Sequence, residues 1–193
     1  MKVDAFLELF TLKDLQRTGW VLRGVEAPES VADHSWGTAL LALRYAGEAE
    51  VDRERALSLA VAHDLIEVRV GDIPRRADPL VPGVDEDEKR RLEEGAARQL
   101  GAELDWPELE SLWREYDEGE SEAARFVRDM NLLDMVLQAT LYRRENRVIP
   151  GRGEQAFPSF SGLDEFFETS RPRLATELGR RLYAVVEGRY REM

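Results

Sequence analysis

Apolar residues recur at helical spacing over most of the chain. Between residues 120 and 144, Phe126, Met130, Leu133, Leu137 and Leu141 recur every three or four positions, which predicts one long helix with a stripe facing the core. Similar patterns predict helices at 4–16, 30–48, 52–68, 85–100, 105–118, 163–169 and 172–189. The pattern contains no convincing strand pair and no internal repeat. We therefore expect an all-α fold, a single compact bundle of about seven or eight helices.

Polar and glycine positions suggest where these helices begin and end. Ser30 or Asp33 is suited to cap the second helix, which would run to about residue 45 or 48. Gly19 is expected to break the first helix, and Gly101 to close the helix at 85–100. The charge run in that helix passes from acidic to basic, as a solvated face would. Five glycines and prolines between residues 148 and 162 predict a loop.

Composition narrows the class of protein. A chain of 193 residues with 43% hydrophobic and 34% charged residues has the balance of a folded protein with one substantial core. The formal charge of −12 argues against a sequence-independent grip on DNA or RNA, so we expect no nucleic-acid polymer as a partner. The absence of cysteine excludes disulfides and thiolate metal sites. We find no secretory segment and no apolar run long enough to span a bilayer, so we expect a cytoplasmic protein without a membrane partner.

The chain has two histidines, and both lie beside acidic residues. His63 and Asp64 are adjacent in the predicted helix at 52–68, about 100° apart around its axis, and Glu67 lies beside both. His34 falls in the first turn of the preceding helix, and two antiparallel helices would bring the two imidazoles together. Mixed imidazole and carboxylate ligands suit one divalent transition metal: Mn, Co, Ni, Fe or Zn. A pair of packed or solvated histidines is the alternative that the local pattern leaves open.

Basic and acidic residues elsewhere are candidates for binding an anionic substrate. Arg17 and Arg23 stand close enough in sequence to approach a common anion, although both could be surface residues. In the segment 71–76, Asp72 could bond a sugar hydroxyl or cap a turn, and Arg75 and Arg76 could meet phosphate or solvent. These alternatives stay open on local grounds.

Four pieces of sequence occur in a characteristic order: RTGWVLR from Arg17, PESVADHSW from Pro28, AHDLIE from Ala62 and GDI from Gly71. Together they resemble the HD-domain metal-dependent phosphohydrolases, and more narrowly their 5'-deoxynucleotidase branch. The resemblance covers about residues 12 to 138. It implies one HD domain over residues 1–193, with a motif-bearing core at about 12–145 and C-terminal helices at about 163–190 packing on it.

The resemblance also implies roles for these residues. His34, His63 and Asp64 would bind one divalent metal, and Glu67 would donate or accept a proton. Arg17 would bind the phosphate and Trp20 the substrate. Asp72 would hold the sugar or aid protonation of the leaving oxygen. Each of these roles is an expectation to be compared with the structure.

One position departs from the family pattern. Asn131 falls where the resemblance implies a metal-binding aspartate, so the amide oxygen would be a fourth ligand without negative charge. Asp134, one turn later, is the alternative ligand, whereas Asp129 points about 160° away from position 131 on a helix. A neutral ligand is expected to hold the metal more weakly.

The resemblance predicts a phosphomonoesterase that removes the 5'-phosphate of deoxynucleoside monophosphates with a metal-activated water. Two alternatives stay open. Asn131 favours a nucleotide-binding or regulatory protein with weak or no turnover, and an HD hydrolase of another phosphate ester is the other. The resemblance further implies a homodimer.

Overall fold

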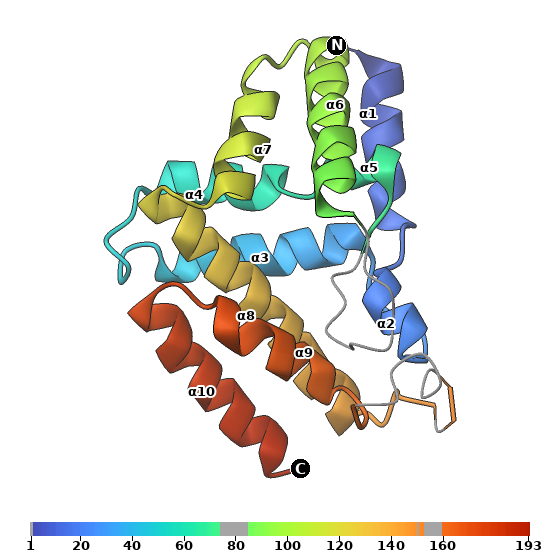
Figure 1. The fold of residues 1–193 in the computed structure, drawn as a ribbon, viewed down its shortest axis with the longest axis vertical. Helices are drawn as coiled ribbons and strands as arrows, with labels where there is room; N and C mark the ends of the chain where they lie inside the picture. The colour runs from blue at the N-terminus through green and yellow to red at the C-terminus, as the bar shows by residue number, and fades with distance from the viewer. Residues whose placement is uncertain (1, 74–84, 150, 153–159) are drawn as a thin grey trace.

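The computed structural model describes residues 2–73, 85–149, 151–152 and 160–193 (Figure 1). In chain order its helices are α1 (Val3–Phe10), η1 (Thr11–Lys13), α2 (Thr18–Leu22), α3 (Val31–Tyr45), α4 (Arg53–Ala62), α5 (Glu67–Val70), α6 (Glu86–Leu104), α7 (Glu108–Glu118), α8 (Glu122–Arg144), α9 (Asp164–Ser170), η3 (Arg171–Arg173) and α10 (Glu177–Arg191). Within the described residues, extended pairing is limited to two isolated bridges. The predicted all-α class is confirmed.

The long helix α8 lies at the centre of the bundle and packs against α3, α4, α7, α9 and α10. Of its predicted core stripe, Phe126, Met130 and Leu133 are buried, but Leu137 is 40% exposed. After Leu133 the buried residues are Val136, Ala139 and Tyr142 instead. They are three residues apart, so the buried face turns gradually around the helix axis. The second half of the predicted stripe was therefore wrong.

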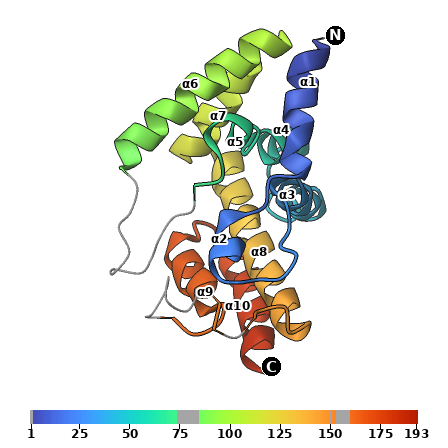
Figure 2. The same ribbon diagram turned by 90° about the vertical axis from the view of Figure 1, so that its right-hand side faces the viewer.

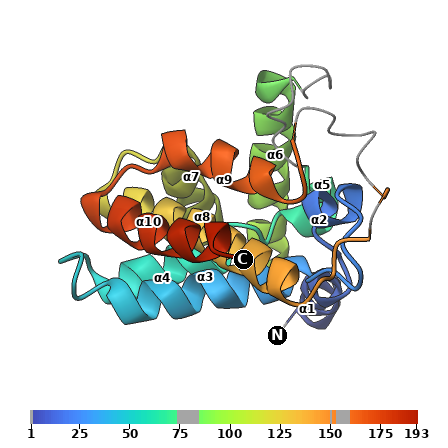
Figure 3. The ribbon, with the colours of Figure 1, turned by 90° about the horizontal axis from the view of Figure 1, so that it is seen from below.

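The remaining helices extend the bundle along its long axis. Figures 1 and 2 show α1 and α6 at one end and α10 at the other, with the chain termini at opposite ends. Seen from below in Figure 3, α3 and α4 run side by side beneath α8 and α10. None of the helices in the described ranges is long and apolar enough to cross a membrane.

The predicted helix at 52–68 is divided in the structure. It is capped by Asp52, whose side chain accepts a hydrogen bond from the Arg55 amide, but α4 ends at Ala62 and α5 begins only at Glu67. A turn at residues 63–66 joins them. His63 and Asp64 therefore lie on a turn rather than mid-helix, and the continuous-helix prediction was wrong.

Two glycines serve packing rather than helix termination. Gly19 lies inside α2, where an added Cβ would lie 3.3 Å from the Phe166 ring. Gly101 lies inside α6, where a Cβ would lie 3.0 Å from the Trp106 carbonyl oxygen. The α6 helix ends at Leu104, with Asp105 in the left-handed conformation (φ 58°). Both predicted stops were thus misplaced: Gly19 packs against Phe166, which is distant in the chain, and Gly101 lies against the turn that follows α6.

Candidate active site

His34 enters the site from the first turn of α3. The Ser30 hydroxyl accepts a hydrogen bond from the Asp33 amide at 3.1 Å, and the Ser30 amide donates to Asp33 Oδ2 at 2.9 Å. This reciprocal pair is a capping box in which Ser30, one of the two predicted candidates, is the N-cap, and it fixes the start of the helix. The next residue, His34, is fully buried.

The turn after α4 brings His63 and Asp64 to the same place. Oδ2 of Asp64 lies 3.0 Å from His63 Nε2 and 3.7 Å from His34 Nε2, and the two imidazole centroids are 5.5 Å apart. One donor atom from each residue lies within 4.8 Å of the other two. The prediction that the two histidines meet is borne out by this geometry.

These three donor atoms fit a metal ion. Nε2 of His34, Nε2 of His63 and Oδ2 of Asp64 are buried and make no well-formed hydrogen bond with the described residues, although Oδ2 lies within ion-pair distance of both imidazoles. A buried polar atom left unpaired costs roughly 1–3 kcal/mol, so three converging ones indicate a ligand. Two imidazole nitrogens and a carboxylate oxygen are the donor set that a divalent transition metal takes.

The protonation states suit metal binding. Burial and the Arg17 charge lower the pKa of His34, which favours the neutral imidazole that ligates metals. Burial opposes the charge of Asp64, but the neighbouring imidazoles and Arg17 outweigh it and hold the pKa of that carboxyl below its usual range. The cluster thus presents a carboxylate beside an imidazole, that of His34, whose neutral form is favoured.

Asp134 contacts His34 from the opposite side. Its Oδ2 lies 2.5 Å from His34 Nδ1, so Nε2 is the nitrogen left to face Asp64. The structure therefore places Asp134 behind the imidazole. Asp129 accepts hydrogen bonds from the Ala175 and Thr176 amides at 2.8 and 2.7 Å, away from the site as expected.

Asn131 lies in the wall of the same cavity. Its Nδ2 donates to the Tyr116 hydroxyl at 2.7 Å, and the Tyr116 ring centroid is 4.9 Å from that of His63. Burial raises the pKa of Tyr116, so the hydroxyl keeps its proton. The amide at position 131 is thereby held beside one of the histidines.

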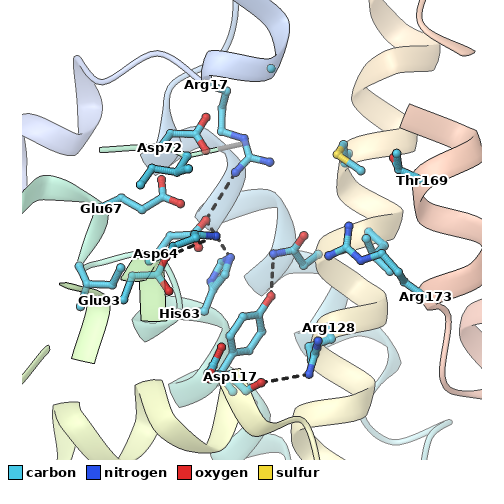
Figure 4. Close-up of a pocket in the computed structure, with 18 of the residues that line it drawn as sticks. Arg17, His63, Asp64, Glu67, Asp72, Glu93, Asp117, Arg128, Thr169 and Arg173 are labelled. Atoms are coloured by element: carbon cyan, nitrogen blue, oxygen red, sulfur yellow. Dashed lines mark hydrogen bonds and ion pairs between the residues drawn. The ribbon is translucent and has the colours of Figure 1, made fainter. Parts of the chain in front are cut away.

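Glu67 and Asp72 line the cavity next to Asp64 (Figure 4). Burial, together with the charges of Asp64 and Asp72, raises the pKa of Glu67 well above its ordinary value, and its Oε2 has no partner among the described residues. Asp72 Oδ2 accepts the Thr18 amide at 2.5 Å, and the Thr18 hydroxyl donates to the Asp72 carbonyl at 2.8 Å. These bonds fix the loop after α5 against the start of α2.

Arg17 reaches the site from the residue before α2. Its Nη1 lies 3.6 Å from Asp64 Oδ2. Burial opposes its charge, but the carboxylates of Asp72 and Asp64 outweigh the cost and raise its pKa, so Arg17 stays cationic. Arg23, by contrast, is buried against Glu165, with Nη2 2.8 Å from Oε2. The idea that the two arginines approach a common anion was wrong.

Trp20 lines the cavity but is only 1% exposed. Its Nε1 donates to Glu29 at 2.9 Å, and its ring lies 3.9 Å from that of Phe166. Trp20 is thus a fixed wall, held by Glu29 on one side and Phe166 on another. Arg75 and Arg76 lie outside the described residues.

The cavity has a volume of about 190 Å³. Further polar residues line it that the sequence did not single out: Lys89, Glu93, Tyr116, Asp117, Arg128, Thr169 and Arg173. Figure 4 shows Arg128 and Arg173 across the cavity from Glu67 and Glu93. Among them, only Lys89 and Glu93 could have been noticed in the sequence, because opposite charges four residues apart on a helix can pair. The prediction that this helix presents a fully solvated face was wrong for these two residues.

The fold and the His–His–Asp cluster define the class of protein, and the chain belongs to the HD domain family, which matches residues 9–157. Among curated proteins it is similar to the 5'-deoxynucleotidase HDDC2 of Mus musculus, 38% identical over 171 residues covering 86% of this chain and 81% of the relative. The 5'-deoxynucleotidase hdd1 of Schizosaccharomyces pombe is 33% identical over 75% of this chain and 74% of the relative. The PH0347 protein of Pyrococcus horikoshii has a similar structure, with a TM-score of 0.73 at 34% identity over 99% of both chains. The chain is therefore an HD-domain protein of the 5'-deoxynucleotidase-like kind.

Proposed function

We propose that the protein is a metal-dependent phosphomonoesterase that hydrolyses the 5'-phosphate of deoxynucleoside monophosphates. One observation carries the proposal: buried donor atoms of His34, His63 and Asp64 that make no hydrogen bond with the described residues converge beside a cavity that Arg17 and Glu67 also line. The similarity to proteins named 5'-deoxynucleotidases supports the substrate class.

His34, His63 and Asp64 would hold the metal, with the amide oxygen of Asn131 as the fourth protein ligand. We propose Mn, Co, Ni, Fe or Zn, because imidazole nitrogen suits these ions better than Mg or Ca. When bound, such an ion polarises phosphate oxygens and lowers the pKa of water to about 7. Asp134, placed on His34 Nδ1, serves as a positioning residue rather than as the alternative ligand.

The other residues act on the substrate. Arg17 binds the phosphoryl oxygens and offsets the charge that they gain as water attacks phosphorus. The bond from phosphorus to the 5'-oxygen breaks, and Glu67 donates the proton that this oxygen needs, since burial and the neighbouring carboxylates raise its pKa and favour the protonated form. Asp72 holds the sugar, and Trp20 with Phe166 forms an apolar wall for the nucleoside.

Asn131 supports a second candidate, a nucleotide-binding protein with weak or no turnover. An amide brings no charge, so the cluster has one carboxylate where an aspartate at position 131 would supply two. Binding without hydrolysis would appear as stabilisation by nucleotide with no product.

Phosphate release tests the two candidates. Protein stripped of metal and reloaded with Mn²⁺, Co²⁺ or Zn²⁺ is given dAMP, AMP and a deoxynucleoside triphosphate. We expect metal-dependent release from dAMP that is lost in His34→Ala and kept in Arg44→Ala, an exposed position on the same helix. Nucleotide-dependent stabilisation without release would favour the binding protein, and release from the triphosphate alone another phosphohydrolase.

We also propose a homodimer formed through the outer face of α3. Trp36, Leu40 and Leu43 are 69%, 49% and 47% exposed and recur at helical spacing, an apolar stripe that a partner surface would cover. Light scattering should show a dimer that Trp36→Glu converts to a monomer, and a monomeric parent would contradict this. The cytoplasmic location and the exclusion of nucleic-acid polymers stay predictions of the sequence.

A further inference from the structure

One ion pair of the charged helix α6 faces the cavity. Lys89 and Glu93 line it, and each side chain is only 16% exposed. Arg90 and Arg98 on the same helix are 55% and 63% exposed; Arg98 pairs with Glu94 and Glu110, and Arg90 pairs with Asp117, which also lines the cavity. The charges of α6 are therefore divided between a solvated face and one inward-facing pair.

The inward pair is held one helical turn apart. Lys89 Nζ lies 3.5 Å from Glu93 Oε1, at i and i+4. Ammonium is a strongly hydrated charge on a flexible stem, and withdrawing it from water costs free energy that a single ion pair at this distance does not readily offset. An anionic ligand in the cavity would add the missing interactions.

Lys89 acts on the same carboxyl group as Arg17. Both positive charges oppose the rise in the pKa of Glu67, which places Lys89 within electrostatic reach of the residues beside Asp64. Figure 4 shows Glu93, the partner of Lys89, on the same side of the cavity as Glu67, with Arg17 above them. The two cations thus line the same cavity from different elements, Arg17 from the residue before α2 and Lys89 from α6.

A phosphate monoester carries two negative charges on three terminal oxygens, more than one arginine can neutralise. We propose that Lys89 is a phosphate-binding residue which, with Arg17, forms a two-cation clamp around the phosphoryl group, and that Glu93 is the positioning residue that aims it. The inference deepens the proposed function by adding a residue to the phosphate subsite. It rests on the same cavity, but it concerns binding and can be tested without turnover.

The test is calorimetric titration of metal-loaded protein with inorganic phosphate and, separately, with deoxyadenosine. A hydrogen bond between charged groups implies that Lys89→Gln weakens phosphate binding on the order of 10- to 100-fold. Deoxyadenosine, which lacks the phosphate, should bind as it does to the parent. Lys89→Arg should recover most of the phosphate affinity. Arg91→Gln, at an exposed position on the same helix, is the matched control and should match the parent.

Phosphate affinity unchanged in Lys89→Gln would overturn the proposal, and so would a parent protein that binds no phosphate. Equal loss of phosphate and deoxyadenosine binding would also overturn it, since that result indicates a structural role for Lys89. If the parent binds phosphate through Lys89 but releases none from dAMP, the proposed function fails and the clamp stands. Turnover of dAMP with a KM unaffected by Lys89→Gln would keep the function and reject the clamp.

Discussion

Oδ2 of Asp134 lies 2.5 Å from Nδ1 of His34, and this contact joins the central helix α8 to the helix α3. The contact sets which nitrogen of the imidazole faces Asp64. It depends on Gly37, because an added Cβ at that position would collide with Asp134 Oδ1. A close crossing of two helices thus orients one of the proposed metal ligands.

Asp134→Asn should weaken metal binding by roughly 10- to 100-fold, because His34 loses its charged partner. The measurement is competition with a chelator of known affinity. Asp129→Asn is the matched control on the same helix. It should lower the melting temperature by weakening the start of α10 and leave metal affinity alone. Equal metal affinity in Asp134→Asn and the parent would contradict the positioning role.

Gly37→Ala should reduce both stability and metal affinity, since the new methyl group displaces Asp134 from His34. Urea denaturation and the same chelator competition measure the two effects. Gly95→Ala in α6 is the control, because a Cβ there meets nothing within 4 Å. Alanine favours the helix over glycine by roughly 0.5–1 kcal/mol, so this control should be slightly stabilised. A Gly37→Ala protein that keeps the stability and metal affinity of the parent would show that the added methyl group does not displace Asp134.

Asn131→Asp should tighten metal binding by roughly 10-fold or more, which is the size of the effect when other residues that support a metal site are changed. The carboxylate adds a negative charge, and the Tyr116 hydroxyl can donate to it where it now accepts from the amide. Faster phosphate release from dAMP should accompany the tighter binding. Unchanged affinity in Asn131→Asp would show that position 131 is not a ligand.

The charged Glu115 should contribute to stability above pH 4.5, and this contribution should be lost in acid. Burial disfavours its charge, but hydrogen bonds from Arg55 and Ser121 outweigh that cost and hold its pKa below the ordinary 4.5. A lowered folded-state pKa stabilises the protein above pH 4.5, and this contribution is lost as the pH falls through the folded value. The advantage of the parent over Glu115→Gln in urea should therefore be larger at pH 7 than at pH 3.5. A constant difference would contradict this linkage.

Local sequence patterns were sufficient for much of the fold. The 3.6-residue period located most helices, and Ser30, one of the two expected candidates, caps α3, because a cap depends on atoms within three residues. The site could be anticipated to the same degree, since the chain has only two histidines and both lie in motifs that resemble the HD family. Asn131 was noticed for the same reason.

Tertiary packing determined the features that the 3.6-residue period of the sequence could not predict. Whether Trp20 is buried, whether Lys89 faces solvent or the cavity, and which nitrogen of His34 meets Asp134 all depend on elements distant in the chain. Arg23 and Glu165 illustrate this, as they pair across 142 residues of sequence. The sequence by itself determined the all-α class and several helix starts, because those follow from short-range geometry, and its resemblance to the HD family supplied the candidate ligands. Only the folded chain assigned each side chain its neighbours, because packing of distant helices fixes which faces meet.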